Sequence, residues 1–368
     1  MIEASLREPL ESVGAIFADL GGVQVVRHYG EPAAEYRAIR ETVGIVVRSD
    51  LARVRLWGRD PVRMVNGLIT NDLAALSNER AVYGFALTAK GRVITDLRVL
   101  SWPSSTGSEL MVDVPTAALP RIGEHFKKFL PPLFSRWEPV HDRLIAIGVY
   151  GPKAREVLAG LLSEEPDLAE DRVTRGTWQE APITAIASRI AGGEEGYELL
   201  VPAERAAELW DELGKRSDAL GGRPAGHAAL ETSRIEAGRP RFGTELTEET
   251  LAAEALESTG LMERTISFQK GCYTGQEVVI RIAHRGHVNR QLRGLLLGDQ
   301  AAPALRTPLH AADTGKEVGW ITSAAHSPRL EQTIALGYLR REIVPPASVH
   351  LGSPTGTAIE VTDLPLTP

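Results

Sequence analysis

The stretch Leu51–Pro61, LARVRLWGRDP, begins a pattern that the chain repeats further on. Its first residues alternate between apolar and polar, which is typical of a half-buried strand, and Gly58 then turns the chain into a helix that begins at Pro61. The stretch Leu144–Pro152, LIAIGVYGP, again places an apolar strand before a glycine and a proline. We therefore expect a strand, a turn and a helix at both places.

The order of predicted elements after each stretch is also the same: a strand pair, a strand that ends in Val-Pro, and a helix that follows it. These landmarks are the hairpin at 82–100 and Val114-Pro115 in the first copy, and the strand pair at 182–201 and Val201-Pro202 in the second. Alternating strands and helices are common, so coincidence stays possible from the residues alone. We favour internal symmetry and predict an α+β fold with two pseudo-symmetric halves, each an antiparallel sheet with helices on one face.

The flanking segments complete the predicted organisation. Residues 8–20 and 33–42 have helical spacing, residues 227–246 begin as a helix that breaks at Gly238, and strand-like alternation begins at Gln291. The last part is expected to be a C-terminal β-barrel or sandwich. The predicted domains are N-terminal helices packing on the core (1–48), a first α+β half (49–140), a second (141–270), a cysteine loop (271–290) and a C-terminal β-barrel domain (291–368).

Composition excludes several classes of protein. A chain of 368 residues with 43% hydrophobic and 24% charged residues is an ordinary globular protein of two or three domains. Its net charge of −7 argues against a broadly basic nucleic-acid-binding surface. The N-terminus does not read as a signal peptide and no apolar run reaches the length of a membrane span, so a cytoplasmic protein with no membrane partner is expected.

The single cysteine, Cys272, limits the possible cofactors. One cysteine forms no intramolecular disulfide, which fits a reducing compartment, and it is too few for a self-sufficient iron–sulfur cluster. There is no cysteine and histidine cluster of the zinc type either. No metal site is therefore predicted.

Cys272 lies in the stretch Lys270–Arg293, KGCYTGQEVVIRIAHRGHVNRQLR. Two glycines four residues apart, Gly271 and Gly275, predict a shaped loop, and the arginines and histidines between 281 and 293 have no acidic residue among them. A thiol near such cations can react as thiolate, whereas a free cysteine in a tight turn is often only a small buried hydrophobe. The basic strip at 281–293 is either solvated or ligand-facing, or it is the one place where RNA contacts could lie.

The duplication also suggests where a ligand could bind. Asp96 lies on the second strand of the first predicted hairpin, and Glu194 and Tyr197 lie in the strand pair that we match to it in the second half. Two such halves packed together bring equivalent hairpins towards a shared cleft. The residues alone leave plainer interpretations open: Asp96 can simply cap the hairpin face, and Glu194 can belong to a solvated turn.

At this point the sequence resembles a known family. The run KGCYTGQE resembles the motif of the YgfZ family of folate-binding proteins, a branch of the superfamily of glycine-cleavage T-proteins (aminomethyltransferases) and related demethylases. The similarity spans roughly residues 35 to 340. The segments similar to T-proteins, in the same order, are those around Asn71-Asp72, Tyr83, KGRVITDLRV with Asp96, GGEEGYE with Glu194 and Tyr197, and SRIEAG with Arg234 and Glu236.

The resemblance implies a clover-leaf arrangement of three domains with tetrahydrofolate in a central channel. It implies that Asp96 lies at the folate one-carbon site as a general base or charge stabiliser, and that Glu194 and Arg234 help to bind folate. A carboxylate such as that of Glu194 can accept from the amino group and ring N–H of a pterin together, with Tyr83 or Tyr197 packing on the ring.

The Cys272 loop resembles YgfZ and departs from T-proteins proper. It implies a folate-binding accessory protein for the assembly or repair of iron–sulfur enzymes, and through them for tRNA modification. Iron–sulfur client proteins would then be its partners, Cys272 would be a catalytic residue, and direct nucleic-acid binding is not expected. The alternative is a folate-dependent aminomethyltransferase, methyltransferase or demethylase of the T-protein type, which depends on Asp96 and the two-half cleft.

Overall fold

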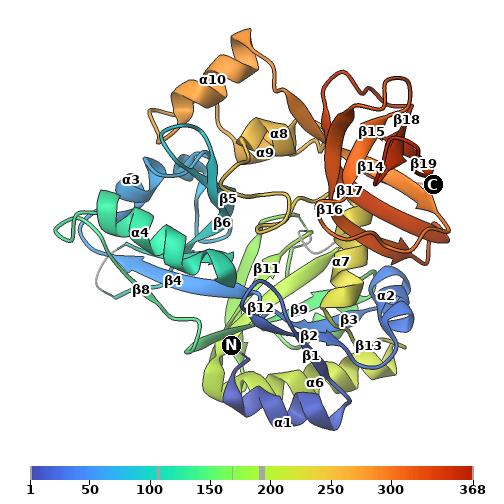
Figure 1. Ribbon diagram of the computed structural model, residues 1–368. Helices are drawn as coiled ribbons and strands as arrows, with labels where there is room; N and C mark the ends of the chain where they lie inside the picture. The colour runs from blue at the N-terminus through green and yellow to red at the C-terminus, as the bar shows by residue number, and fades with distance from the viewer. Residues whose placement is uncertain (1, 106–107, 168, 190–194, 367–368) are drawn as a thin grey trace.

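The computed structural model describes residues 2–105, 108–167, 169–189 and 195–366. Figure 1 shows three bodies around a common centre: a first half in blue and teal on the left, a second half in green and yellow below, and a barrel in orange and red at the upper right. The α+β fold with two sheet-and-helix halves and a C-terminal barrel is therefore confirmed.

The first half is a five-stranded antiparallel sheet in the order β5-β6-β7-β4-β8. Apolar side chains on one face of the sheet, such as Val54 and Val112, share a core with Phe126 of its helix α4. Its strands are β4 (Leu51–Trp57), β5 (Val82–Leu87), β6 (Val93–Trp102), β7 (Glu109–Pro115) and β8 (Arg136–Pro139), with α3 (Pro61–Asn66), η1 (Leu73–Ala75), η2 (Thr116–Ala118) and α4 (Leu119–Phe129).

The second half repeats this order in a six-stranded sheet, β10-β11-β12-β9-β3-β13. Its first four strands match β5-β6-β7-β4, so the duplicated order expected from the sequence is present in the sheets. The elements are β9 (Leu144–Tyr150), α5 (Ala154–Leu158), β10 (Val173–Trp178), β11 (Ala181–Ala187), β12 (Gly196–Pro202), η3 (Ala203–Arg205), α6 (Ala206–Ala219), β13 (Arg223–Pro224) and β3 (Gly44–Val47).

The match that we expected between the two hairpins is shifted by one strand. The sequence analysis did not predict β10, whose Thr174, Arg175 and Gly176 interrupt the apolar alternation that marks a strand. The hairpin β5–β6 therefore corresponds to β10–β11, and the strand pair at 182–201 corresponds to β6–β7. Tyr197 on β12 is consequently the counterpart of a residue on β7 and not of one beside Asp96.

The N-terminal segment contains more than the helices expected there. The helix predicted over residues 8–20 is α1 (Ala4–Ser12), and Gly14 follows it with a φ of 87°, after which the chain forms the hairpin β1 (Ile16–Asp19) and β2 (Gln24–His28). After α2 (Pro32–Glu41), β3 pairs with β9, so the segment 1–48 supplies a strand to the sheet of the second half.

The C-terminal part is a closed six-stranded barrel, and not a sandwich, in the order β14-β17-β16-β15-β18-β19. Leu295, Leu309 and Val361 lie in its core with no exposed surface. Its strands are β14 (Arg290–Gly298), β15 (Pro308–Ala311), β16 (Glu317–Ser327), β17 (Gln332–Arg340), β18 (Ala347–Leu351) and β19 (Ala358–Thr362).

Four helices connect the halves to the barrel. They are α7 (His227–Glu236), which packs against β16, and α8 (Ala252–Leu256), α9 (Met262–Thr265) and α10 (Gln276–Arg285). Figure 1 shows α7 between the second half and the barrel, and α10 at the top edge of the molecule. Among the helices in the described part of the chain, none is long and apolar enough to cross a membrane.

Candidate functional site

A cavity of about 530 Å³ lies where the three bodies meet. Its wall takes residues from the first half (Tyr83, Asp96), from the β1–β2 hairpin, from α7 (Glu231), from the segment that follows α7 (Arg239) and from β16 of the barrel (Ala324). Small-molecule sites are commonly of this size and form between domains. The cavity is therefore the candidate site.

Asp96 and Tyr83 reach the cavity from the β5–β6 hairpin. Phe85 pairs with Asp96 in this hairpin, so Tyr83 is the diagonal neighbour of Asp96 on the same face. The Tyr83 hydroxyl donates to Asp96 Oδ2 at 2.8 Å. Asp96 Oδ1 is buried and has no hydrogen-bond partner among the described residues. Because buried polar atoms are almost always satisfied, this oxygen is available to an N–H or O–H of a ligand.

The electrostatics of Asp96 suit a proton acceptor. Burial raises the pKa of Asp96, and the charge of Asp50 adds to the rise. Burial also raises the pKa of Tyr83 well above its usual value, so Tyr83 stays a neutral donor. A carboxylate with a raised pKa and a fixed donor on one oxygen can take a proton or stabilise a developing positive charge at its other oxygen.

Tyr83 is fixed from behind by Asn71 and Arg264. The Asn71 side-chain amide donates to the carbonyl oxygens of Tyr83 at 2.8 Å and of Arg264 at 2.7 Å. The Arg264 guanidinium lies 5.5 Å from the centre of the Tyr83 ring and pairs with Asp171 at 3.0 Å. The phenol is thus held between the two halves, which limits its freedom to move away from Asp96.

The pKa of a second carboxylate in the cavity wall, that of Asp50, is shifted in the opposite direction. Its Oδ1 lies 2.9 Å from Arg48 Nε and 3.1 Å from His227 Nε2. Burial alone would raise the pKa of Asp50, but Arg48 and His227 outweigh it and lower the pKa well below its usual value. The site therefore holds one carboxylate that stays ionised and one that protonates more readily, a contrast typical of acid–base sites.

The wall beside Asp50 continues into a buried charge network between the halves. Arg48 Nη1 donates to Glu198 Oε1 at 2.7 Å, and Arg98 pairs with both Glu198 and Asp113. Although burial would raise the pKa of Glu198, Arg98 and Arg48 together lower it. Glu198 thus joins β12 of the second half to β6 of the first.

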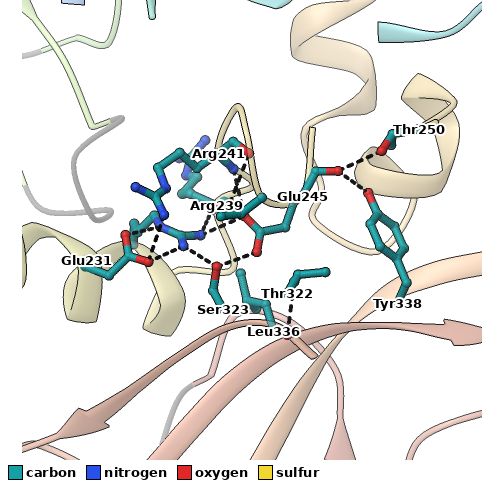
Figure 2. Close-up of polar contacts among 11 residues, drawn as sticks. Glu231, Arg239, Arg241, Glu245, Thr250, Thr322, Ser323, Leu336 and Tyr338 are labelled. Carbon is teal, nitrogen blue, oxygen red and sulfur yellow. Dashed lines mark hydrogen bonds and ion pairs between the residues drawn. The ribbon is translucent and has the colours of Figure 1, made fainter. Parts of the chain in front are cut away.

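Arg234, a predicted folate-binding residue, lines the cavity but has already used its donors. Nε and Nη2 donate to Glu231 at 2.7 and 2.5 Å, and Nη1 donates to Glu245 at 3.0 Å and to the carbonyl oxygen of Arg239 at 3.1 Å. Nη2 also donates to Ser323, and Figure 2 shows Glu231, Glu245 and Ser323 gathered at this point. An arginine has five N–H groups, so this structure leaves Arg234 none for a ligand.

The other predicted site residues lie elsewhere. Tyr197 has no exposed surface and packs in the apolar core of the second half, and it does not line the cavity. Glu194 lies outside the described residues, so its predicted role stays a prediction. Cys272 is exposed, lies on the loop before α10 and does not line the cavity either. The structure therefore brings together Asp96, Tyr83 and Arg234, but not Tyr197 or Cys272.

The loop that carries Cys272 is firmly attached to the first half. Lys270 Nζ donates to the carbonyl oxygens of Asn66 at 2.6 Å, Asn71 at 2.7 Å and Ile69 at 3.1 Å. The Tyr273 side chain is buried against the core that includes Phe85. Cys272 is consequently held in place as an exposed thiol, as the loop prediction requires, and is not a buried hydrophobe.

Several cavity residues were missed by the sequence analysis. They are Asp50, His227, Glu231, Arg239 and Arg241. Glu231 and Arg234 do have a local signal, because residues three apart face each other on a helix. Asp50 and His227 have none, since they meet only through packing of distant segments. Within the described residues, no group of three or more His, Cys, Asp or Glu side chains could hold a metal ion.

Comparisons with known proteins agree with this architecture. Two family models match the chain: the GCVT N-terminal domain over residues 6–270 and the glycine cleavage T-protein C-terminal barrel domain over residues 290–366. A protein named aminomethyltransferase from Thermoanaerobacter sp. (strain X514) is 27% identical over 324 residues, which cover 87% of this chain and 84% of that protein.

A second protein named aminomethyltransferase, from Saccharopolyspora erythraea, is 28% identical over 363 residues, 98% of this chain and 95% of that protein. Among solved structures, the glycine cleavage system aminomethyltransferase T from Bartonella henselae superposes with a TM-score of 0.83 at 19% identity, covering 99% of this chain and 98% of that one. At this identity the superposition shows a shared fold.

Proposed function

The chain belongs to the glycine-cleavage T-protein family, and on that premise we propose that it binds tetrahydrofolate in the central cavity and transfers a one-carbon group, as an aminomethyltransferase-type enzyme. The observation that carries the proposal is Asp96, whose Oδ1 is buried without a partner in the wall of the cavity while Oδ2 is held by Tyr83.

In the proposed reaction Asp96 acts at the nitrogen of tetrahydrofolate that accepts the one-carbon group. As the nitrogen forms its new bond to the carbon, the bond between that carbon and the donor breaks and the donor leaves with the electron pair. The nitrogen then carries positive charge and loses a proton, which a carboxylate oxygen beside it can accept. The hydroxyl of Tyr83 keeps the other oxygen in place, so Asp96 need not reorient when charge develops. Glu194 stays a proposed partner of the pterin edge.

The test compares binding with turnover. The purified protein is titrated with tetrahydrofolate under reducing conditions, and transfer from an aminomethyl donor is then measured for the wild type and for Asp96→Asn. We expect the variant to bind within a few-fold of the wild type and to lose about 10²-fold or more in transfer rate, as for loss of a general base. Asp142→Asn, an exposed aspartate, is the matched control. Unchanged transfer by Asp96→Asn would contradict the proposal.

A second candidate function rests on the exposed Cys272. Its loop is anchored through Lys270 and its thiol faces solvent, as a residue that acts on a protein client would. In this role the protein is a folate-binding accessory factor of the YgfZ type for iron–sulfur enzymes. Complementation of a gene deletion with Cys272→Ser, with the activity of iron–sulfur enzymes as readout, tests it. Full complementation would count against any role of the thiol.

A further inference from the structure

Two arginines that line the cavity are left without full counter-ions by the protein. They are Arg239 and Arg241, on the segment that follows α7. Within the described part of the chain, the guanidinium of Arg239 makes no hydrogen bond or ion pair; only its backbone does, accepting from Arg234 and donating to it. Figure 2 shows the two arginines between Glu231 and Glu245.

The guanidinium of Arg241 has one long contact with a carboxylate, while its backbone N–H donates to Glu245 Oε2 at 3.0 Å. Its Nη2 lies 3.4 Å from Glu231 Oε1, and its Nε is buried with no hydrogen-bond partner among the described residues. Glu231 already accepts two shorter bonds from Arg234, at 2.5 and 2.7 Å. Glu245 is occupied in the same way, because Arg234, Ser323 and Thr244 all donate to it.

Both arginines are also partly withdrawn from water. Burial lowers the pKa of Arg239 and of Arg241, although the charges of nearby carboxylates, Glu170 for Arg239 and Glu231 for Arg241, act in the opposite direction. The Arg241 side chain is 28% exposed, so these cations are half-buried and incompletely paired, and an anion that enters the cavity would stabilise them. A guanidinium presents two parallel N–H groups that match the two oxygens of a carboxylate.

Arg239 and Arg241 also interact electrostatically with residues around Asp96. The charge of Arg239 is close enough to act on the Tyr83 hydroxyl, and that hydroxyl donates to Asp96. Arg241 is close enough to Asp50 for the two charges to interact. An anion held by Arg239 and Arg241 would therefore lie in the same cavity as the reactive carboxylate.

We propose that Arg239 and Arg241 anchor a carboxylate group of the molecule that binds in the cavity. The inference rests on the proposed function, because that function defines the two possible sources of the carboxylate. One source is the glutamate end of tetrahydrofolate. The other is a small amine that carries a carboxylate and donates the one-carbon group.

The first arm of the test uses tetrahydrofolate and 6-methyltetrahydropterin, which has the pterin ring but no carboxylate. Binding of each is measured by titration calorimetry for the wild type, Arg239→Gln and Arg241→Gln. If the carboxylate is that of folate, the two variants lose about 10- to 100-fold in affinity for tetrahydrofolate, the range expected for a charged hydrogen bond, and none for the pterin.

The second arm uses N-methylglycine and methylamine, added to the protein in the presence of tetrahydrofolate. If the carboxylate belongs to the donor, the variants keep their affinity for tetrahydrofolate but lose N-methylglycine binding by at least about 10-fold, with methylamine unaffected. Arg143→Gln, which removes an exposed arginine outside the cavity, controls for net charge in both arms. The melting temperature of each variant confirms that it is folded.

The two proposals fail in different ways. If the wild type binds both folate and pterin, and neither tetrahydrofolate nor N-methylglycine depends on Arg239 or Arg241, the carboxylate anchor is overturned while the proposed function stands. If the wild type binds neither folate nor pterin, the proposed function is lost. The anchor then survives only if N-methylglycine binds and the arginine variants weaken it.

Discussion

At the level of single residues, two aspartates in the cavity wall differ in the groups that surround them. Asp50 has Arg48 and His227 beside it and stays ionised, whereas Asp96 has one neutral donor and an oxygen without a partner. A ligand that donates a hydrogen bond to this oxygen would therefore stabilise Asp96. Such a residue should lower stability in the absence of a ligand, a cost often found at functional sites.

Asp96→Asn should therefore make the protein more stable at neutral pH. Because the pKa of Asp96 is raised on folding, the folded state holds a proton more tightly than the unfolded state, and the free energy of unfolding falls as pH rises through that window. The amide keeps an acceptor for Tyr83 and removes the buried charge. Melting temperatures should be higher for the variant at pH 7, and the difference should disappear below about pH 4, the usual aspartate range.

Asp142→Asn controls for loss of a carboxylate at an exposed position. It should leave the melting temperature nearly unchanged at both pH values. If Asp96→Asn were less stable than the wild type at pH 7, Asp96 would instead contribute to the stability of the fold. The unpartnered oxygen would then no longer indicate a ligand-binding role.

Lys270→Met should destabilise the protein by about 1–3 kcal/mol, the cost of leaving buried acceptors without a donor. The ammonium group of Lys270 satisfies carbonyl oxygens of Asn66, Ile69 and Asn71, and methionine fills similar space but donates nothing. Burial lowers the pKa of Lys270 to about 8. Urea unfolding at pH 7 measures the effect, with the exposed Lys90→Met as control. Equal stability of the two variants would contradict the prediction.

At the level of elements, the loop and α10 depend on close backbone approach to the β5–β6 hairpin. Gly275 has a φ of 85°, and a Cβ there would lie 2.6 Å from the carbonyl oxygen of Thr88. At the tip of the hairpin, a Cβ on Gly91 would lie 2.8 Å from Val278 of α10. The β5–β6 hairpin thus carries Asp96 on strand β6 and contacts the Cys272 loop and α10 at its turn.

Gly275→Ala should loosen the loop and α10 from the hairpin. A non-glycine residue in the left-handed region costs about 1–2 kcal/mol, and the contact with Thr88 adds to this. Hydrogen exchange at residues 276–285 should become faster, and the Cys272 thiol should be modified at a different rate. Gly271→Ala is the matched control, because a Cβ there meets nothing within 4 Å. Identical exchange in the two variants would contradict the expectation.

At the level of the whole molecule, the two halves are joined by buried charge as well as apolar packing. Leu100 of the first half packs with Ile186 and Leu200 of the second. Beside this contact Glu198 pairs with Arg48 and Arg98. Since the cavity lies where the bodies meet, this network also fixes the distance between the walls that hold Asp50 and Asp96.

Glu198→Gln should destabilise the protein by about 3–5 kcal/mol, because it leaves buried Arg48 and Arg98 without this counter-ion. The lowered pKa of Glu198 sets the pH dependence: its contribution is present above the usual glutamate pKa of about 4.3 and is lost as pH falls through the lowered value. Calorimetry should therefore show a gap between wild type and variant at pH 7 that narrows in strong acid.

Glu138→Gln is the control for this experiment, since Glu138 forms solvent-accessible pairs with Arg143 at 3.1 Å and with Arg55 at 3.7 Å. Exposed ion pairs contribute about 0–1 kcal/mol. If Glu198→Gln destabilised the protein no more than Glu138→Gln, the buried charge network would not be what holds the two halves together.

Local patterns in the chain were enough to predict the architecture and the hairpin that carries Tyr83 and Asp96. Strand and helix periods depend on residues near one another in the chain, so the duplicated halves and the C-terminal barrel could be predicted. The contact of Tyr83 with Asp96 is local in the same sense, because both lie on one hairpin. Strand β10 was missed because polar residues and a glycine interrupt its pattern.

The pairing of the charged side chains, in contrast, depends on how distant segments pack together. Arg234 matched a family motif, yet its donors are taken by Glu231, Glu245 and Ser323, while the guanidinium of Arg239 lines the cavity and makes no hydrogen bond or ion pair among the described residues. Asp50 and Glu198 likewise acquire their states from partners far away in the chain. The physical reason is that the charge state of a buried group depends on which atoms surround it, and those atoms come together only when the three bodies pack.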